Sequence, residues 1–209
     1  MPKLSDQQTA QRRTRILDAA ERCFARDGFH RTTMQAICKE AGISAGALYL
    51  YFPSKEALIE GLTSRDRDEI LAQFAAASGE GDFIGAIGGL LKSCILCQPR
   101  EKAMLCIEIG AEATRNRAIA ETMARFDAEI RASLSGLLAK AKAAGQIDPK
   151  GPLDDIVVAM ALIGDGLFWR RAVDPTFDPE RAMPQITSMI AALVRPQIKP
   201  KTFSNTEIA

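Results

Sequence analysis

The feature that most constrains the fold of this chain is a run of thirty residues that carries the start and stop signals of two short helices. The run, Phe29–Leu58, reads FHRTTMQAICKEAGISAGALYLYFPSKEAL. Thr32 and Gln35 have the spacing of a capping box, in which each side chain accepts a free backbone N–H at a helix start. Gly42 can adopt the left-handed conformation that ends a helix, and Ser44 can cap the next one. The run therefore predicts two short helices joined by a glycine turn.

Two helices joined in this way form a helix-turn-helix, expected here over about residues 33–52. The second helix of such a motif is shaped to enter the major groove of DNA. The turn and the second helix also carry the pattern Ile43-Ser-x-Gly46-x-Leu48-Tyr49-x-Tyr51-Phe52-x-Ser54-Lys55-Glu56-x-Leu58. With the amphipathic helix before it, this pattern resembles the N-terminal domain of the TetR family of bacterial transcriptional regulators, over roughly Arg12 to Leu62.

The resemblance implies a ligand-responsive transcriptional repressor that binds double-stranded DNA at a palindromic operator as a homodimer. A small, largely apolar effector would release the protein from the operator, which would control an efflux or metabolic operon. A DNA-bound protein that recruits a protein partner without sensing a small molecule is the alternative. The residues themselves identify neither the effector nor the operator sequence.

The resemblance also implies which residues face the DNA. The positions that match phosphate contacts are Thr33, Tyr49, Tyr51 and Lys55. The positions nearest the bases are Ser44, Ala45, Gly46 and Ala47. The last three have no polar side-chain group, so close approach, thymine-methyl contacts and DNA shape should contribute more to sequence recognition than direct hydrogen bonds.

Elementary electrostatics supports the assignment of Lys55. A lysine in the first turn of a helix adds its charge to the positive end of the helix dipole, which is unfavourable unless an anion arrives. The aromatic residues of the motif have an alternative role as core residues of a small domain. We favour that structural role for Phe52 and the DNA-facing role for Tyr49 and Tyr51.

Helical periodicity continues through the rest of the 209-residue chain, without the alternating pattern of strands. The prediction is an all-α fold of about nine helices, with a three-helix helix-turn-helix domain followed by a larger helical bundle. The expected divisions are a DNA-binding domain over residues 1–78, a ligand-binding and dimerisation domain over 79–198, and a flexible tail over 199–209.

The net charge of +1 conceals an asymmetry. Residues 1–55 contain nine Lys or Arg and five Asp or Glu, whereas the remainder contains eighteen and twenty-one. A basic N-terminal part fits a polyanionic partner, although a solvated helix face also explains so small an excess. No run approaches the roughly 18 to 20 apolar residues that span a bilayer, and the N-terminus has no apolar signal core. We therefore expect a cytoplasmic protein with no membrane partner.

The last two predicted helices are the best candidates for a dimer interface, because each is apolar on more than one face. Gly164 and Gly166 would permit close backbone approach between copies. The apolar residues expected at the interface are Ile163, Leu167, Ile186, Met189, Ile190 and Leu193. Packing within one subunit is the alternative for part of each stripe.

The effector pocket has a weaker signature. Carboxylates and aromatic residues on apolar helices, Glu108, Glu112, Asp165, Phe168 and Trp169, would line a cavity for a largely apolar ligand with one polar or cationic group. In the alternative, the two glutamates face solvent, with Arg115 as a partner, and the tryptophan lies in the dimer core.

No enzyme, metal site or cofactor is expected. The only histidine is His30, which excludes HExxH and paired ExxH sites, and neither GxGxxG nor GxxxxGK[ST] occurs. The cysteines are Cys23, Cys38, Cys94, Cys97 and Cys106. The Cys94-x-x-Cys97 spacing would suit a metal or redox sensor near Cys106, but we favour small buried core residues for all five.

Overall fold

The computed structural model describes residues 5–77 and 82–197, and within these ranges the chain forms helices and no strand. The α-helices are α1 (Asp6–Asp27), α2 (Met34–Ala41), α3 (Ala45–Tyr51), α4 (Lys55–Ala77), α5 (Phe83–Leu91), α6 (Arg100–Ala113), α7 (Arg117–Ala143), α8 (Leu153–Val173) and α9 (Pro179–Val194). A five-residue π-helical segment, η1 (Lys92–Leu96), continues α5. The all-α prediction is confirmed. The predicted domain boundary at 78/79 and the tail over 199–209 lie outside the described residues.

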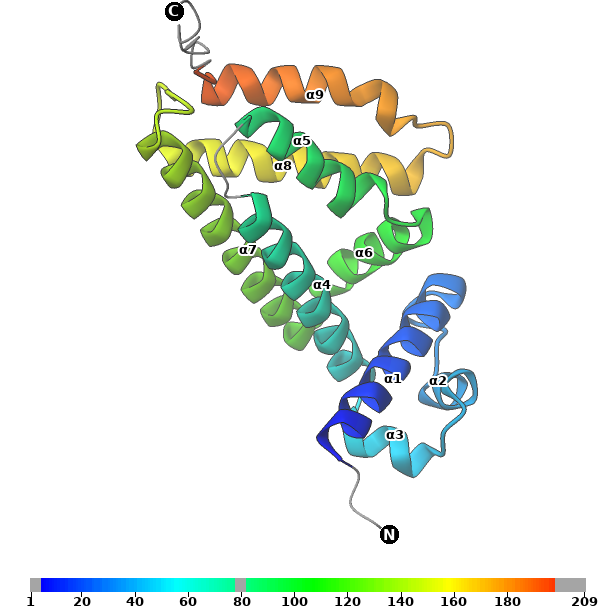
Figure 1. Cartoon of the computed structure of the whole chain (residues 1–209). Coiled ribbons are helices and arrows are strands. Elements are labelled where there is room, and N and C mark those ends of the chain that lie inside the picture. Colours follow the sequence, from blue (N-terminus) through cyan, green and yellow to red (C-terminus); the bar gives the residue numbers. More distant parts are fainter. Residues whose placement is uncertain (1–4, 78–81, 198–209) are drawn as a thin grey trace, which may run out of the picture.

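The small domain at the lower end of Figure 1 consists of α1, α2 and α3 around one apolar core. Its largest fully buried side chains include Phe24, Ile37 and Leu48. The beginning of α4 adds Leu58 and Ile59. Residues from much later in the chain complete the same core, namely Leu105, Ile109 and Ile119 of α6 and α7. The helix-turn-helix is therefore packed directly onto the larger helical part.

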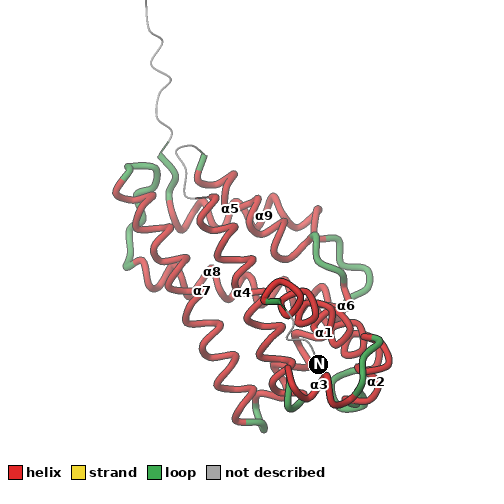
Figure 2. Tube along the Cα trace, turned by 60° about the horizontal axis from the view of Figure 1, so that its bottom comes forward, coloured by secondary structure: helices red, strands yellow, loops and turns green. Residues whose placement is uncertain are grey.

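A second core lies at the other end, between α5, α7, α8 and α9. Its members are Phe83, Ile87, Leu90, Leu134, Leu137, Leu138, Ala141, Ile147, Ile156, Val157, Met160, Ile190 and Val194. The end of α4 reaches this core through Phe74 and Ala77. Since α4 runs beside α7 (Figure 2), these two long helices connect the cores.

Helix caps explain most of the element boundaries at the N-terminal end. Ser5 and Gln8 form a complete capping box at α1, and Gly42 ends α2 in the left-handed conformation at φ 65°. The capping residue of α2 is Thr33, whose hydroxyl accepts from the backbone N–H of Ala36, so the predicted capping box at Thr32 is wrong. Thr32 is instead buried, and its hydroxyl donates to backbone carbonyls of the preceding segment.

No helix of the described residues is both long and apolar enough to cross a lipid bilayer.

Candidate nucleic-acid interface

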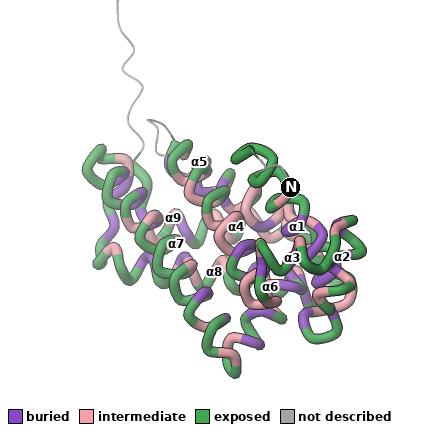
Figure 3. Tube along the Cα trace, turned by 90° about the horizontal axis from the view of Figure 1, so that it is seen from below, coloured by how far each residue is buried: buried purple, intermediate pink, exposed green. Residues whose placement is uncertain are grey.

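Helix α3 has one buried face and one face open to solvent (Figure 3). Ser44 caps the helix by accepting from the backbone N–H of Ala47 at 3.3 Å. Leu48 is fully buried, whereas Tyr49 is 52% exposed and Leu50 83% exposed. An exposed turn at Ser44 and Gly46 precedes these side chains. The helix is thus held from within and presents its first turn and its middle outward.

Gly46 lies on the open side of α3. A Cβ added to this residue would meet no atom within 4 Å, so packing within the protein does not require glycine here. Ala45 is also exposed, but Ala47 is half-buried and less available to a ligand. The first turn of α3 therefore offers backbone and small side chains that a second molecule can approach closely.

Phe52 anchors the end of α3 in the core, as predicted. Its side chain is 2% exposed, and the guanidinium of Arg13 lies 4.6 Å from its ring centroid. Gly61 of α4 makes room for the ring, because a Cβ there would lie 2.8 Å from Leu17 and 2.9 Å from Phe52. Tyr51 is half-buried against the same core, so at most its outer part is free for a ligand.

Lys55 adds positive charge to the start of α4, which is unfavourable unless an anion arrives, but its ammonium already has partners within the chain. Its Nζ donates to the backbone carbonyls of Phe29 at 2.7 Å and His30 at 3.3 Å. It also lies 4.4 Å from the centroid of the Phe29 ring, a cation–π distance. The chain folds this pair of carbonyls from the loop between α1 and α2 onto the lysine, which the local sequence pattern did not indicate.

Leu50 is a candidate contact residue that the motif did not single out. An exposed leucine in a short helix is informative here because Tyr49 beside it and Gly46 one turn before it are exposed as well. A helical wheel would have found it, since Leu48 and Phe52 mark the buried face and the residue midway between them points away.

Two residues predicted for an effector pocket lie instead against the loop between α1 and α2. Glu108 accepts from the backbone N–H of Phe29 at 2.7 Å. Glu112 is only 7% exposed, and its Oε2 lies 3.0 Å from Nε2 of His30 and 2.6 Å from Nε of Arg115. The pairing with Arg115 is confirmed, but the expected solvent face is wrong for Glu112. Long-range packing of α6 onto the small domain placed both carboxylates.

The other three pocket candidates lie on α8. Trp169 is 54% exposed, so it does not line an enclosed cavity in the single chain. Asp165 is exposed as a residue, but partial desolvation of its carboxyl, followed by the nearby charge of Asp127, raises the pKa of that group. Phe168 is half-buried. A role for these residues in effector binding stays a prediction.

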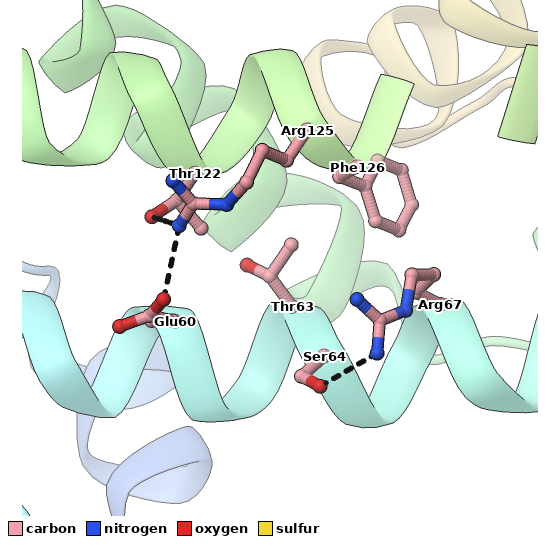
Figure 4. A pocket seen from close by; sticks show the side chains of 7 residues that line it. All are labelled: Glu60, Thr63, Ser64, Arg67, Thr122, Arg125 and Phe126. Atoms are coloured by element: carbon pink, nitrogen blue, oxygen red, sulfur yellow. Dashed lines mark hydrogen bonds and ion pairs between the residues drawn. The ribbon is translucent and has the colours of Figure 1, made fainter. Parts of the chain in front are cut away.

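A small polar pocket of about 80 Å³ lies elsewhere, between α4 and α7 (Figure 4). Its lining residues are Glu60, Thr63, Ser64, Arg67, Thr122, Arg125 and Phe126. Arg125 donates to Glu60 at 2.9 Å and to Thr122 at 3.1 Å, and Arg67 donates to Ser64 at 3.0 Å. The pocket is far below the roughly 300 Å³ of a small-molecule site, and its polar groups already bond one another.

The residues predicted for a dimer interface divide into two groups. Leu167 and Ile190 are 5% and 1% exposed in the single chain, so their assignment to an intersubunit surface is wrong. They pack within their own subunit. Ile163, Ile186 and Leu193 are half-buried against the second core, whereas Met189 is 56% exposed.

The apolar surface on α8 follows a different stripe. Its members are Val158, Leu162, Trp169 and Val173, which are 45%, 64%, 54% and 48% exposed. Spacings of four, seven and four residues place all of them on one helix face. We call these four residues the α8 stripe. The sequence did not separate this stripe from the buried one because α8 is apolar on both sides.

The cysteines occupy unlike environments. Cys23 and Cys38 are buried as predicted, but Cys97 is exposed, so the prediction of five buried cysteines is wrong. Burial, followed by the charge of Asp66, raises the pKa of the Cys106 thiol to about 11. Burial also raises the pKa of Cys94. Among the described residues, no group of three or more His, Cys, Asp or Glu side chains is placed to hold a metal ion.

Comparison with known proteins connects this geometry to a family. The family described as "Bacterial regulatory proteins, tetR family" matches residues 16–62, which include the helix-turn-helix. The family described as "BetI-type transcriptional repressor, C-terminal" matches residues 97–195. Together the two matches span most of both cores.

Individual relatives agree with the two matches. The HTH-type transcriptional regulator UidR of Escherichia coli is 34% identical over 137 residues, 66% of this chain and 69% of UidR. The HTH-type transcriptional repressor Rv1474c of Mycobacterium tuberculosis is 31% identical over 183 residues, 87% of this chain and 92% of that protein. The structure of Salmonella enterica GusR superposes with a TM-score of 0.78 at 28% identity, covering 93% of this chain and 100% of GusR. The chain therefore belongs to the TetR family of bacterial transcriptional regulators.

Proposed function

We propose that the protein is a ligand-responsive repressor that binds a palindromic DNA operator as a homodimer. A small, largely apolar effector releases it, and the operator controls an efflux or metabolic operon. The observation that carries the DNA-binding part is the outward face of α3, where Ser44, Gly46, Tyr49 and Leu50 are exposed beside a capped first turn. The proposal draws its remaining support from family membership.

The chemistry of this face suits duplex DNA. A first turn with small side chains can approach base edges closely, and Leu50 can contact a thymine methyl group. Tyr49 and the hydroxyl of Thr33 can donate to phosphates, while Lys55 adds positive charge nearby. Tyr51 contributes only its outer part.

We expect a dimer because one copy of the protein can contact only a short stretch of DNA. A single seven-residue α3 makes too few contacts for specificity, so two copies should read two half-sites. The α8 stripe supplies the apolar surface for pairing, together with Met189 on α9. Stacking α8 and α9 of both copies would form a four-helix bundle across the interface.

Effector release requires a ligand that binds two conformers with different affinity. In one conformer the distance between the two copies of α3 would not match the half-sites. A ligand that prefers this conformer lowers operator affinity by as much as its own affinity differs between the two conformers. The half-buried Phe168 and the exposed residues Asp165 and Trp169 are the remaining candidates from the predicted pocket.

A selection experiment tests the DNA-binding part. The full-length protein should enrich inverted repeats from a random-sequence duplex library, and Tyr49→Ala should bind the enriched duplex more weakly while remaining a dimer. Enrichment of no common sequence, or loss of the dimer in Tyr49→Ala, would contradict the proposal. Screening metabolites for a rise in Tm separates an effector-responsive repressor from the alternative of a DNA-bound recruiter.

A further inference from the structure

One residue between α1 and α2 is held on both sides by side chains from other helices. The backbone N–H of Phe29 donates to Oε2 of Glu108 on α6 at 2.7 Å. Its carbonyl accepts from Nζ of Lys55, the first residue of α4, also at 2.7 Å. Phe29 thus joins a carboxylate of the larger helical part to the lysine that matches a phosphate-contacting position.

The contact with Glu108 depends on a glycine. Gly28 has a φ of 80°, and a Cβ on it would lie 2.8 Å from Oε1 of Glu108. A side chain at this position would displace the carboxylate and would also strain the backbone. The loop therefore has a shape that admits Glu108.

The final turn of α6 makes a second contact with the same loop. Oε2 of Glu112 lies 3.0 Å from Nε2 of His30, and Nη2 of Arg115 lies 2.7 Å from the same nitrogen. Since Glu112 is buried, this contact is part of the packing between α6 and the small domain. A shift of α6 would therefore disturb both its contact with the Phe29 backbone and its contact with the His30 ring.

Lys55 retains a free donor while it is held. Its ammonium has three N–H groups, of which two face the carbonyls of Phe29 and His30. The ring of Phe29 limits its movement further. The ammonium is therefore held in place while one N–H stays available for a phosphate oxygen. Such a side chain loses less conformational entropy on binding than a lysine that is free to move.

We propose that Glu108 is a positioning residue for DNA binding. It fixes the Phe29 peptide, which in turn holds Lys55 for a phosphate contact, so that movement of α6 weakens operator binding through this contact. The inference rests on the proposed DNA-binding function.

Operator affinity measured at several salt concentrations tests this assignment on a duplex enriched by the full-length protein. Glu108→Ala should weaken binding about tenfold, the size of one charge-assisted hydrogen bond. The slope of log affinity against log salt should fall by about 0.9 for each lost phosphate contact. In a Lys55→Ala background, Glu108→Ala should no longer weaken binding or lower the salt slope, and should change affinity only by the slight strengthening that loss of one negative charge gives.

Glu101→Ala is the matched control, because Glu101 is an exposed glutamate on the same helix. Removing a negative charge by itself should strengthen DNA binding slightly, so the control and Glu108→Ala should change affinity in opposite directions. Glu108→Gln keeps the size and one acceptor, and should lie between the wild type and Glu108→Ala.

The inference fails if Glu108→Ala strengthens binding as Glu101→Ala does, or if its effect adds fully to that of Lys55→Ala. A Tm lowered by Glu108→Ala with an unchanged salt slope would also assign the carboxylate a purely structural role. If the wild type enriches no sequence at all, the proposed DNA-binding function fails instead.

Discussion

The α3 face and the α8 stripe both expose apolar side chains, but on different kinds of surface. On α3, the exposed Leu50 lies beside the phenol of Tyr49 and a turn of small residues. On α8, Leu162 and Trp169 belong to a longer apolar stripe, and the exposed Gly166 lies one turn beyond Leu162 on the same side of the helix. A narrow amphipathic face suits the grooves and phosphates of DNA, whereas a long apolar stripe suits a second apolar helix.

The two regions also differ in what fixes them. Caps and a glycine turn set the ends of α3, and Phe52 secures it from below. On α8, the same helix packs Leu167 inward and leaves Leu162 outward. The first region is complete in one chain, whereas the second would gain a partner through the proposed dimer.

The largest effect should come from removing the anchor of α3. Phe52→Ala should lower the free energy of unfolding by about 3–5 kcal/mol, because it deletes a fully buried ring. Chemical denaturation monitored by circular dichroism measures the loss. Leu50→Ala, at the exposed neighbouring site, should change stability by less than about 0.5 kcal/mol. If both variants lost a similar free energy of unfolding, Leu50 would contribute to the core as Phe52 does, and α3 would have no free face.

A charge in the α8 stripe should break the dimer. Leu162→Glu should raise the dissociation constant of the dimer by about a hundredfold, because pairing would desolvate an unpaired carboxylate. Sedimentation velocity over a concentration series measures this change. Ala139→Glu adds the same charge at an exposed site on α7 and should leave association unaltered. A dimer of unchanged affinity in Leu162→Glu would move the interface away from the stripe.

A methyl contact should distinguish Leu50 from the stripe residues. On an enriched duplex, replacing thymine by uracil at the contacted position should cost the wild type about 1 kcal/mol of binding free energy. Leu50→Ala should lose a similar amount and become insensitive to that replacement. Fluorescence anisotropy gives both affinities. Equal uracil sensitivity in the two proteins at every thymine would exclude this contact.

The smallest effect concerns Asp165, beside the α8 stripe. Burial and the charge of Asp127 raise its pKa, while Arg131 acts in the opposite direction. The ionised form therefore destabilises the fold at neutral pH, and this cost disappears as pH falls below the ordinary carboxyl range. Asp165→Asn should raise Tm by less than about 2 °C at pH 7, with a smaller gain at pH 4. A gain in Tm that increases toward low pH would contradict a raised pKa of Asp165.

Local signals were enough to predict most of the α3 region. Gly42, Ser44 and Phe52 act through neighbours within a few residues or through one small core, so spacing alone indicated their roles. Even there, the cap of α2 lies one residue from its predicted place, because Thr32 was drawn into the core.

The contacts of Glu108 and the exposed face of α8 depend on packing between distant parts of the chain, which the sequence pattern does not show. The carboxylate of Glu108 meets a backbone N–H seventy-nine residues away, and no periodic pattern encodes that distance. On α8, two apolar faces looked equivalent until packing buried Leu167 and left Leu162 exposed. Residue type indicated that these positions mattered, and only the fold showed what they touch.

The spacing of the two half-sites tests the central claim most directly, since we propose that pairing through the α8 stripe sets the distance between the two copies of α3 on DNA. Full-length protein should bind an enriched inverted repeat with half-sites about one helical turn, ~34 Å, apart. Inserting five base pairs between the half-sites turns one to the opposite side of the duplex. The account predicts that affinity then falls to that of a single half-site. Unchanged affinity for the lengthened duplex would contradict it.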